Sequence, residues 1–497
     1  MYSLVTLENN SASRRRDTRV AIAVLLASWA LFAALEQSPF KLQGAVLESL
    51  VERGRLHFVR GHMKDIVFEN FDTKTPSFRY LFNIFPHGGV YYVNHAPGQF
   101  LLAAPWYAAA VKLGWRFETD ERLVWRWLVW LLTAPLGALG VMCVFILARR
   151  WGAPWQPALL TSIVLALCSP WWAASGVLYH DSLAVALILI GGTVWVCQPA
   201  QGFGVVLRPF VAGLLLAYSV VTTYLVLPVV LLICFFILAA GPSRRETVLF
   251  ASGFLPTLAI LPIANMMSFG SFWATGYSAG GFDKNYPSPL DVFNAWEKTG
   301  FYLWHAEYGL LSLFPVFLMG ALGLVLWRPA DPSVRKLLLT LAVGHFLFII
   351  TMEHHGSVGW GMGRFFLPLY AVLVFGLTAI WQLEGWKGSV ARALVFGSML
   401  YSAVFAASGA WYGLQGVMEP GVPSLKLRFI FANYEYYQML FLSSLIVGVT
   451  GELAYQWLGT PSLQTTEGAA VKSSPGVSQA SSKSHPVKHS RRNRRRR

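Results

Sequence analysis

The sequence predicts an all-α polytopic membrane protein with about twelve transmembrane helices and with juxtamembrane helices in its first outer loop. Of its 497 residues, 55% are hydrophobic and only 13% are charged, whereas an ordinary soluble domain carries roughly a quarter charged residues. Because a single apolar core stops growing at about 250–300 residues, this much apolar chain needs lipid around its helices. The composition excludes a soluble globular enzyme.

The predicted helices follow from the apolar runs. Residues 1–19 are polar and end in Arg14, Arg15, Arg16 and Arg19, directly before the first run, 20–35. No small-residue cleavage pattern ends that run, so we expect a retained helix and not a signal peptide. Further runs of spanning length lie at about 122–147, 155–174, 178–198, 207–222, 224–240, 247–267, 309–328, 335–352, 365–383, 391–412 and 437–457.

The Lys and Arg residues of the short loops predict the orientation, since cytoplasmic loops carry an excess of them. The pattern places both termini in the cytoplasm and residues 36–121 and 267–308 in outer loops. It requires that the short apolar run Gln99–Leu113 does not cross, because Arg149 and Arg150 would otherwise lie outside. We expect a multi-pass protein of the cell inner membrane, with a transmembrane domain over 20–459 between a cytoplasmic N-terminus, 1–19, and a C-terminal tail.

The C-terminal tail, 460–497, holds much of the formal net charge of +15. It contains nine Lys or Arg residues and one acid, Glu467, and it is rich in Ser, Pro and Arg. Such a segment cannot bury enough apolar surface to fold. We expect a disordered cytoplasmic tail that binds anionic lipid and not nucleic acid.

The polar residues gather on the predicted outer side. Eight of the eleven histidines and most of the acids lie in segments predicted to face outward. Charged residues are expelled from hydrocarbon at a cost of ~2.5–3.5 kcal/mol each, but expulsion predicts no preference for one side. The distribution therefore favours a polar site on the extracytoplasmic side.

Two carboxylates of the first outer loop are candidates for a general base. Glu36 directly follows the first apolar run, and Glu48 lies in the amphipathic stretch 42–54. A carboxylate near the membrane boundary is partly desolvated, which raises its proton affinity and suits it to take a proton from an alcohol or amine. The alternative is an ordinary helix-end acid in water.

Cations and histidines at predicted outer helix ends could bind an anion. Arg364 begins an apolar run after a Gly-rich stretch, where its guanidinium could grip two phosphate oxygens or simply reach out of the lipid. Lys284 lies in an outer loop, and His354 and His355 lie upstream of Arg364. Adjacent histidines rarely ligate one ion together, so no cofactor is predicted with certainty, and a divalent cation stays open.

Other polar residues lie at predicted helix mouths. Asp181 follows His180, and this pair could orient an acceptor or bind a cation. Alternatively, Asp181 could cap the following helix. His95 precedes a short apolar helix. The four cysteines lie within or at the ends of apolar runs and imply neither a disulfide framework nor a CxxC metal site.

Several phrases, taken in order, resemble the GT-C superfamily of membrane glycosyltransferases, which includes protein O-mannosyltransferases and lipid A arabinosyl- and galacturonosyltransferases. After the first run and Glu36 come VNHAPG (93–98), SPWWAASGVLYHDSLA (169–184), FGSFWATGY (269–277), GLLSLFPVFLMGALGL (309–324) and WGMGRFFLPLY (360–370). The resemblance covers roughly residues 20–384. The superfamily most often has Asp where this chain has Glu36, and His-Pro-Pro or Lys-Pro-Pro where this chain has His95-Ala96-Pro97.

The resemblance implies transfer of a sugar from a polyprenyl-phosphate carrier to an extracytoplasmic lipid, glycan or protein acceptor. If a carboxylate base activates the acceptor, and the acceptor attacks the anomeric carbon opposite the leaving group, the outcome is inversion. The implied base is Glu36, with Glu48 second. Implied substrate-binding residues are His95, His180, Asp181, Tyr277, Lys284, His354, His355 and Arg364; Tyr277 could instead anchor the membrane interface.

Three other classes of function remain as alternatives. A secondary transporter needs polar or broken helices near the bilayer midplane and internal repeats, and the apolar runs carry almost no such charge. A sugar-lipid polymerase or ligase usually has one very large outer loop late in the chain, whereas the longest loop here follows the first run. A noncatalytic scaffold is the third alternative.

Overall fold

The computed structural model describes residues 11–34, 41–58, 84–87, 90–93, 95–197, 203–275, 295–304, 309–329, 331–351, 364–416 and 434–458. The chain divides into two compact units, Met1–Glu452 and Leu453–Arg497. All elements discussed below lie in the first unit, except the last residues of the C-terminal helix.

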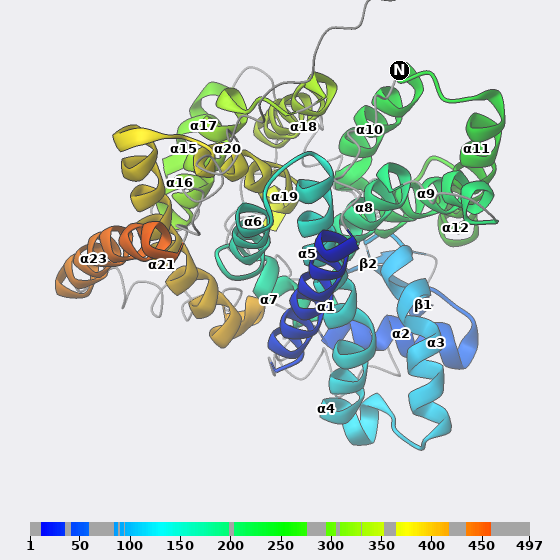
Figure 1. Cartoon of the computed structure of the whole chain (residues 1–497). Helices are drawn as coiled ribbons and strands as arrows, with labels where there is room; N and C mark the ends of the chain where they lie inside the picture. The colour runs from blue at the N-terminus through cyan, green and yellow to red at the C-terminus, as the bar shows by residue number, and fades with distance from the viewer. Residues whose placement is uncertain are drawn as a thin grey trace, which may run out of the picture. The chain divides into compact units, whose positions relative to one another are not determined.

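Helices make up nearly all of the described residues (Figure 1). The first part of the chain contains α1 (Ser11–Ala33), α2 (Lys41–Arg53), α3 (Gly98–Lys112), α4 (Phe117–Leu128), the π-helix η3 (Val129–Thr133), α5 (Ala134–Arg150), α6 (Trp155–Leu167), α7 (Trp171–Ser175) and α8 (His180–Val196). The middle part contains α9 (Phe203–Thr222), the 3-10 turn η4 (Tyr224–Val226), α10 (Leu227–Ala239), α11 (Arg244–Leu258), α12 (Ile260–Phe269) and α15 (Ala295–Trp304). The last part contains α16 (Leu310–Leu313), α17 (Val316–Leu326), α18 (Pro332–Thr351), η6 (Arg364–Phe366), α19 (Leu367–Leu373), η7 (Val374–Gly376), α20 (Leu377–Trp381), α21 (Gly385–Gly416) and α23 (Tyr434–Leu458).

Every predicted apolar run coincides with one of these helices or with two to four consecutive elements among them. Within the described residues, six helices are long and apolar enough to cross a membrane: Phe117–Arg150, Gly204–Thr222, Arg244–Phe269, Pro332–Thr351, Gly385–Ala407 and Gln438–Trp457. Five shorter apolar helices lie at Trp155–Leu167, His180–Val196, Tyr224–Ala239, Val316–Leu326 and Leu367–Trp381. The chain is a multi-pass membrane protein, and the total of about twelve crossings stays a prediction.

A small sheet departs from the prediction of helices alone. Strands β1 (His57–Phe58), β2 (Ile84–His87) and β3 (Val90–Val93) form an antiparallel sheet in the order β1-β3-β2. The VYYV segment of β3 is β-branched and aromatic, which favours a strand, and two glycines separate it from β2. The sheet lies in the first predicted outer loop and leads directly into α3.

Helices α2 and α3 occupy the predicted positions of the two short helices in this loop, and they pack against each other (Figure 1). Ala45, Val46 and Leu47 of α2 are buried. Leu47 belongs to a cluster with Tyr107 of α3 and Val124 of α4. The apolar face of α2 therefore packs on other helices of this unit. That α2 lies at the membrane surface stays a prediction.

Glycines allow several helices to approach at backbone distance. A Cβ atom on Gly323 of α17 would lie 2.0 Å from the Gly376 carbonyl oxygen of η7, and one on Gly253 of α11 would lie 2.1 Å from the Phe210 carbonyl oxygen of α9. Small residues at helix contacts are typical of membrane proteins, where lipid offers no hydrophobic drive for association. These contacts fix α17 against η7 and α11 against α9.

Candidate functional site

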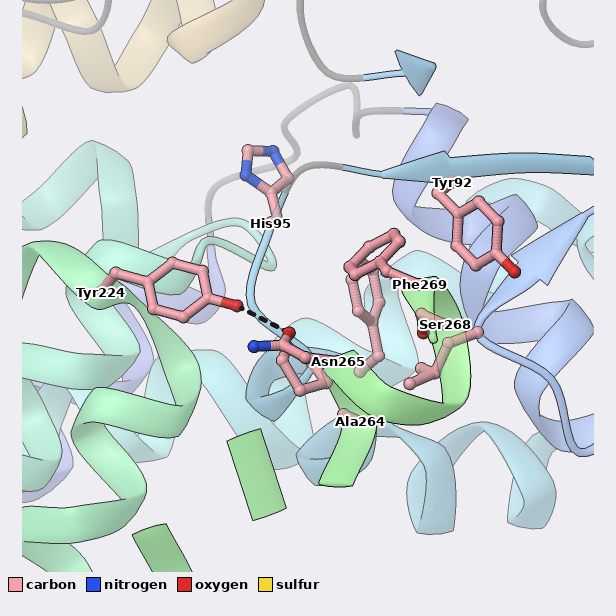
Figure 2. Close-up of a pocket in the computed structure, with 10 residues that line it drawn as sticks. Tyr92, His95, Tyr224, Ala264, Asn265, Ser268 and Phe269 are labelled. Carbon is pink, nitrogen blue, oxygen red and sulfur yellow. Dashed lines mark hydrogen bonds between the residues drawn. The ribbon is translucent and has the colours of Figure 1, made fainter. Parts of the chain in front are cut away.

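An open cleft lies where the small sheet and the start of α3 meet η4 and the end of α12 (Figure 2). Its volume is about 380 Å³, including the open mouth. The lining residues are Leu56, Tyr92, His95, Pro97, Phe100, Tyr224, Ala264, Asn265, Ser268 and Phe269. Four chain segments that lie far apart in the sequence thus build one cleft.

The polar groups of the cleft come mainly from η4 and α12. Figure 2 shows the Tyr224 ring directed toward Asn265, and the Tyr224 hydroxyl donates to Asn265 Oδ1 at 3.5 Å. The Asn265 amide donates in turn to the Phe272 carbonyl at 3.3 Å. This amide is nearly buried and held at both ends, so it presents a fixed polar group beside the cleft.

Aromatic rings form the opposite wall of the cleft. The Tyr92 ring of β3 lies 5.1 Å from the Phe269 ring of α12, and the His57 ring of β1 lies 5.3 Å from the Tyr92 ring. Burial, and then the charge of Arg55, lower the pKa of His57 below its ordinary value. Rings placed in this way could stack on the apolar face of a sugar.

His95 joins the cleft to a buried pair behind it. The His95 ring lies 4.4 Å from the His180 ring, between centroids. His180 Nε2 lies 3.4 Å from Asp181 Oδ1, and these two side chains are only 4% and 5% exposed. Thr223, the residue between α9 and η4, donates a side-chain hydrogen bond to the Asp181 carboxylate. The structure therefore brings together three of the predicted site residues, from two distant segments.

Asp181 does not cap α8. Tyr179, in extended conformation, is the N-cap residue of α8 and makes no side-chain capping bond. Asp181 lies in the first turn, where its negative charge favours the positive end of the helix dipole, and it pairs with His180. Ser182 fixes this turn by donating to the Ala174 carbonyl at 2.8 Å. Of the two interpretations of Asp181, the structure favours the polar pair.

Gly98 sets the position of His95 through a close backbone approach. A Cβ atom on Gly98 would lie 2.6 Å from backbone atoms of Val221 and Thr222 in α9. The Tyr218 hydroxyl of α9 donates to the Gly98 carbonyl at 3.0 Å. The start of α3 is thus held against the end of α9, which places His95 next to the residues of η4.

Glu48 belongs to a different cluster. Burial, and then the charges of Glu52 and Glu118, raise the pKa of Glu48 to about 7. Glu48 and Glu52 in turn act on Tyr107 of α3. Tyr107 is nine residues beyond the start of α3, which at 1.5 Å per residue is about 14 Å along the helix. Glu48 therefore lies toward the far end of α3 from His95, and its role as a base stays a prediction.

The remaining predicted site residues fall mostly outside the described residues: Glu36, Tyr277, Lys284, His354 and His355. Arg364 begins the turn η6, which leads into α19. In that turn the Phe365 carbonyl lies 2.8 Å from Nε2 of His345 in α18. Among the described residues, no group of three or more His, Cys, Asp or Glu side chains could hold a metal ion.

The sequence reasoning missed Thr223, Tyr224 and Asn265. Thr223 and Tyr224 interrupt the apolar pattern between two helices, and Asn265 is an isolated amide near the end of an apolar run. A polar side chain within an apolar run is costly unless it has a partner. That cost was the signal by which these three residues could have been found.

No protein-family model matches the chain, and no curated protein matches its sequence. Among solved structures, the chain is similar to ArnT from Cupriavidus metallidurans bound to undecaprenyl phosphate, with 13% identity, 90% of this chain and 78% of that chain covered, and a TM-score of 0.44. It is also similar to the oligosaccharyltransferase AglB from Archaeoglobus fulgidus in complex with an inhibitory peptide and a dolichol-phosphate, with 14% identity, 90% and 59% covered, and a TM-score of 0.43. Similarity at this level assigns neither an activity nor a site residue to this chain.

Proposed function

We propose that this protein is a membrane glycosyltransferase that moves a sugar from a polyprenyl-phosphate carrier to a lipid, glycan or protein acceptor. One observation carries the proposal. Three phrases that carry the sequence resemblance, around His95, around His180 and from Phe269 onward, are far apart in the chain, and residues of all three line or adjoin the same cleft. A chance resemblance in short phrases would not favour a shared location.

The groups in the cleft suit a sugar. A sugar ring offers hydroxyls on its edges and an apolar face, and recognition needs fixed hydrogen-bonding groups beside aromatic surfaces. Tyr224, Asn265 and His95 provide the first, and Tyr92 and Phe269 provide the second. The carrier phosphate needs cations, for which Arg364 and Lys284 stay the predicted residues.

The proposed reaction forms a bond from the acceptor oxygen or nitrogen to the anomeric carbon and breaks the bond from that carbon to the phosphate. Attack opposite the phosphate inverts the anomeric carbon. The proposal includes an active site on the periplasmic side of the inner membrane and contact of the basic tail with anionic lipid. Charge growing on the leaving phosphate is stabilised by fixed cations and donors.

Substitution of Asn265 tests this function. Membranes that contain the protein are incubated with undecaprenyl-phosphate sugars labelled in the sugar, and label is followed into lipid, glycan and protein. We expect Asn265→Leu to reduce transfer about tenfold or more, because losing a buried hydrogen-bonding group costs about 1–3 kcal/mol.

Thr257→Val is the matched control for this test. Thr257 lies in the same long helical stretch, and its hydroxyl donates to the Gly253 carbonyl of its own helix. Transfer by Thr257→Val should match the wild type at equal membrane abundance. Wild-type rates in Asn265→Leu would remove the cleft from the proposed site, and no transfer by the wild type from any carrier sugar would contradict the function.

A further inference from the structure

The cleft is in contact with a buried histidine–aspartate pair through the ring of His95. His95 lines the cleft, and its ring lies 4.4 Å from that of His180, which lies 3.4 Å from the Asp181 carboxylate. His180 and Asp181 are 3% and 4% exposed as whole residues. A carboxylate at such depth is costly unless a positive partner compensates it.

Two imidazoles and one carboxylate thus share a small volume. The negative charge of Asp181 favours a proton on either ring, whereas two protons would place two cations in contact. The Thr223 side chain also interacts with the carboxylate, and the Tyr179 ring lies 4.7 Å from the His180 ring. A proton that arrives at His95 from the cleft therefore lies close to an acidic side chain that is shielded from water.

We propose that His95 takes the proton of the acceptor during sugar transfer and that His180 and Asp181 act through His95 as positioning residues. This inference rests on the proposed function. As the acceptor oxygen bonds to the anomeric carbon, its O–H bond breaks and the proton moves to a ring nitrogen of His95. The bond from carbon to phosphate oxygen breaks, and its electron pair leaves with the polyprenyl phosphate. The proton later passes from His95 to water.

The position of His95 favours it over Glu48, which lies toward the far end of α3. Proton transfer needs the base within hydrogen-bond reach of the reacting group, and His95 is the residue that both lines the cleft and contacts the buried pair. Glu36 is the competing base implied by the sequence resemblance, and the experiment below separates the two.

The described titratable groups around His95 belong to four elements, α8, η4, β3 and β1. His180 and Asp181 of α8 lie behind it, Tyr224 of η4 lines the same cleft, and Tyr92 of β3 lines the aromatic wall with His57 against it. The tyrosines are neutral near pH 7. Asp181 is thus the carboxylate among these groups, and its removal should change the protonation of His95.

The first arm of the experiment needs no substrate. The full-length protein in lipid nanodiscs is treated with diethylpyrocarbonate, which acylates neutral imidazoles, and modification of His95 is followed by mass spectrometry between pH 5 and pH 8. We expect the midpoint for His95 to fall by about one pH unit in Asp181→Asn, because removing a nearby negative charge disfavours the protonated ring. Asp181→Glu should restore the midpoint toward that of the wild type.

Asp17→Asn is the matched control. Asp17 pairs with Arg149 at 2.7 Å, away from the cleft residues, so its loss should leave the His95 midpoint unchanged. Unfolding is monitored by size-exclusion profile and melting temperature in every variant. An unchanged midpoint in folded Asp181→Asn would overturn the role of the buried pair.

The second arm measures transfer from labelled undecaprenyl-phosphate sugar. His95→Gln should lower kcat about 100-fold, the usual scale of general-base loss, while KM for the donor stays within about threefold. Wild-type kcat in His95→Gln, with loss of kcat in Glu36→Gln, would assign the base to Glu36 and overturn the proposal for His95. If the wild type transfers no sugar although the midpoint shift is present, the proposed function is wrong and only the coupling of His95 to Asp181 stands.

Discussion

At the residue scale, the buried polar side chains form two kinds of pair. Some are paired for structure, such as Arg392 and Glu452, which form two hydrogen bonds of 2.8 and 2.7 Å between α21 and α23. Others, such as His180 and Asp181, make a looser pair beside an open cleft. Tight bidentate geometry offsets the desolvation of a buried charge, whereas a looser pair leaves protonation states available for chemistry.

Glu48 provides a prediction at this scale. Burial raises its pKa to about 7, well above its unfolded value. The folded protein therefore binds more protons than the unfolded chain between about pH 4.5 and pH 7, and stability falls as pH rises through that window. Glu48→Gln should raise the melting temperature by about 1–2 °C at pH 8 and leave it unchanged at pH 4.5. The exposed Glu384→Gln should change neither value, and a loss of stability at pH 8 in Glu48→Gln would contradict the prediction.

At the scale of elements, the predicted and observed secondary structures agree in the long apolar runs, where a lipid environment permits few backbone conformations. Apolar runs of this length must form helices, because backbone groups in hydrocarbon need partners within the same segment. The sheet β1–β3 lies outside these runs, where that constraint is absent. His95, His180 and Asp181 could be named from their places at predicted helix mouths. That Thr223 and Asn265 join them depends on helix packing, such as the approach of α3 to α9 at Gly98, which no periodicity in the sequence reveals.

Gly98 gives the prediction for this scale. Gly98→Ala would place a Cβ atom 2.6 Å from the backbone of Val221 and Thr222, so the start of α3 must move away from α9 and carry His95 with it. We expect a loss of about 1–3 kcal/mol in stability, the usual cost of overpacking, measured as a lower melting temperature. Gly192→Ala in α8, where no atom lies within 4 Å of the new Cβ, should be neutral or slightly stabilising. Equal melting temperatures for the two variants would contradict this account.

At the scale of the whole molecule, the polar pairs of the first unit join residues that are predicted to lie on the same side of the membrane. Asp17 pairs with Arg149, Arg208 with Glu246, and Arg392 with Glu452, and all six lie toward helix ends predicted to face the cytoplasm. His95 with His180, and Tyr224 with Asn265, join residues at or near ends predicted to face outward. The pairing of Asp17 with Arg149 agrees with the expectation that Gln99–Leu113 does not cross.

Accessibility labelling tests the predicted orientation of the chain in the membrane. In a variant that lacks Cys143, Cys168, Cys197 and Cys234, single cysteines are introduced as Ser271→Cys, just after α12, and Arg150→Cys, at the end of α5. A membrane-impermeant maleimide should label the first in intact spheroplasts and the second only after permeabilisation, because positive loops are retained in the cytoplasm. Labelling of both from outside would mean that an even number of the five runs predicted between residues 150 and 271 cross the membrane, so that at least one of these runs does not span it. Labelling of the Arg150→Cys variant alone would mean that the orientation is the reverse of the predicted one. The cleft, with His95, would then lie on the cytoplasmic side, and the carrier sugar would have to be available on that side.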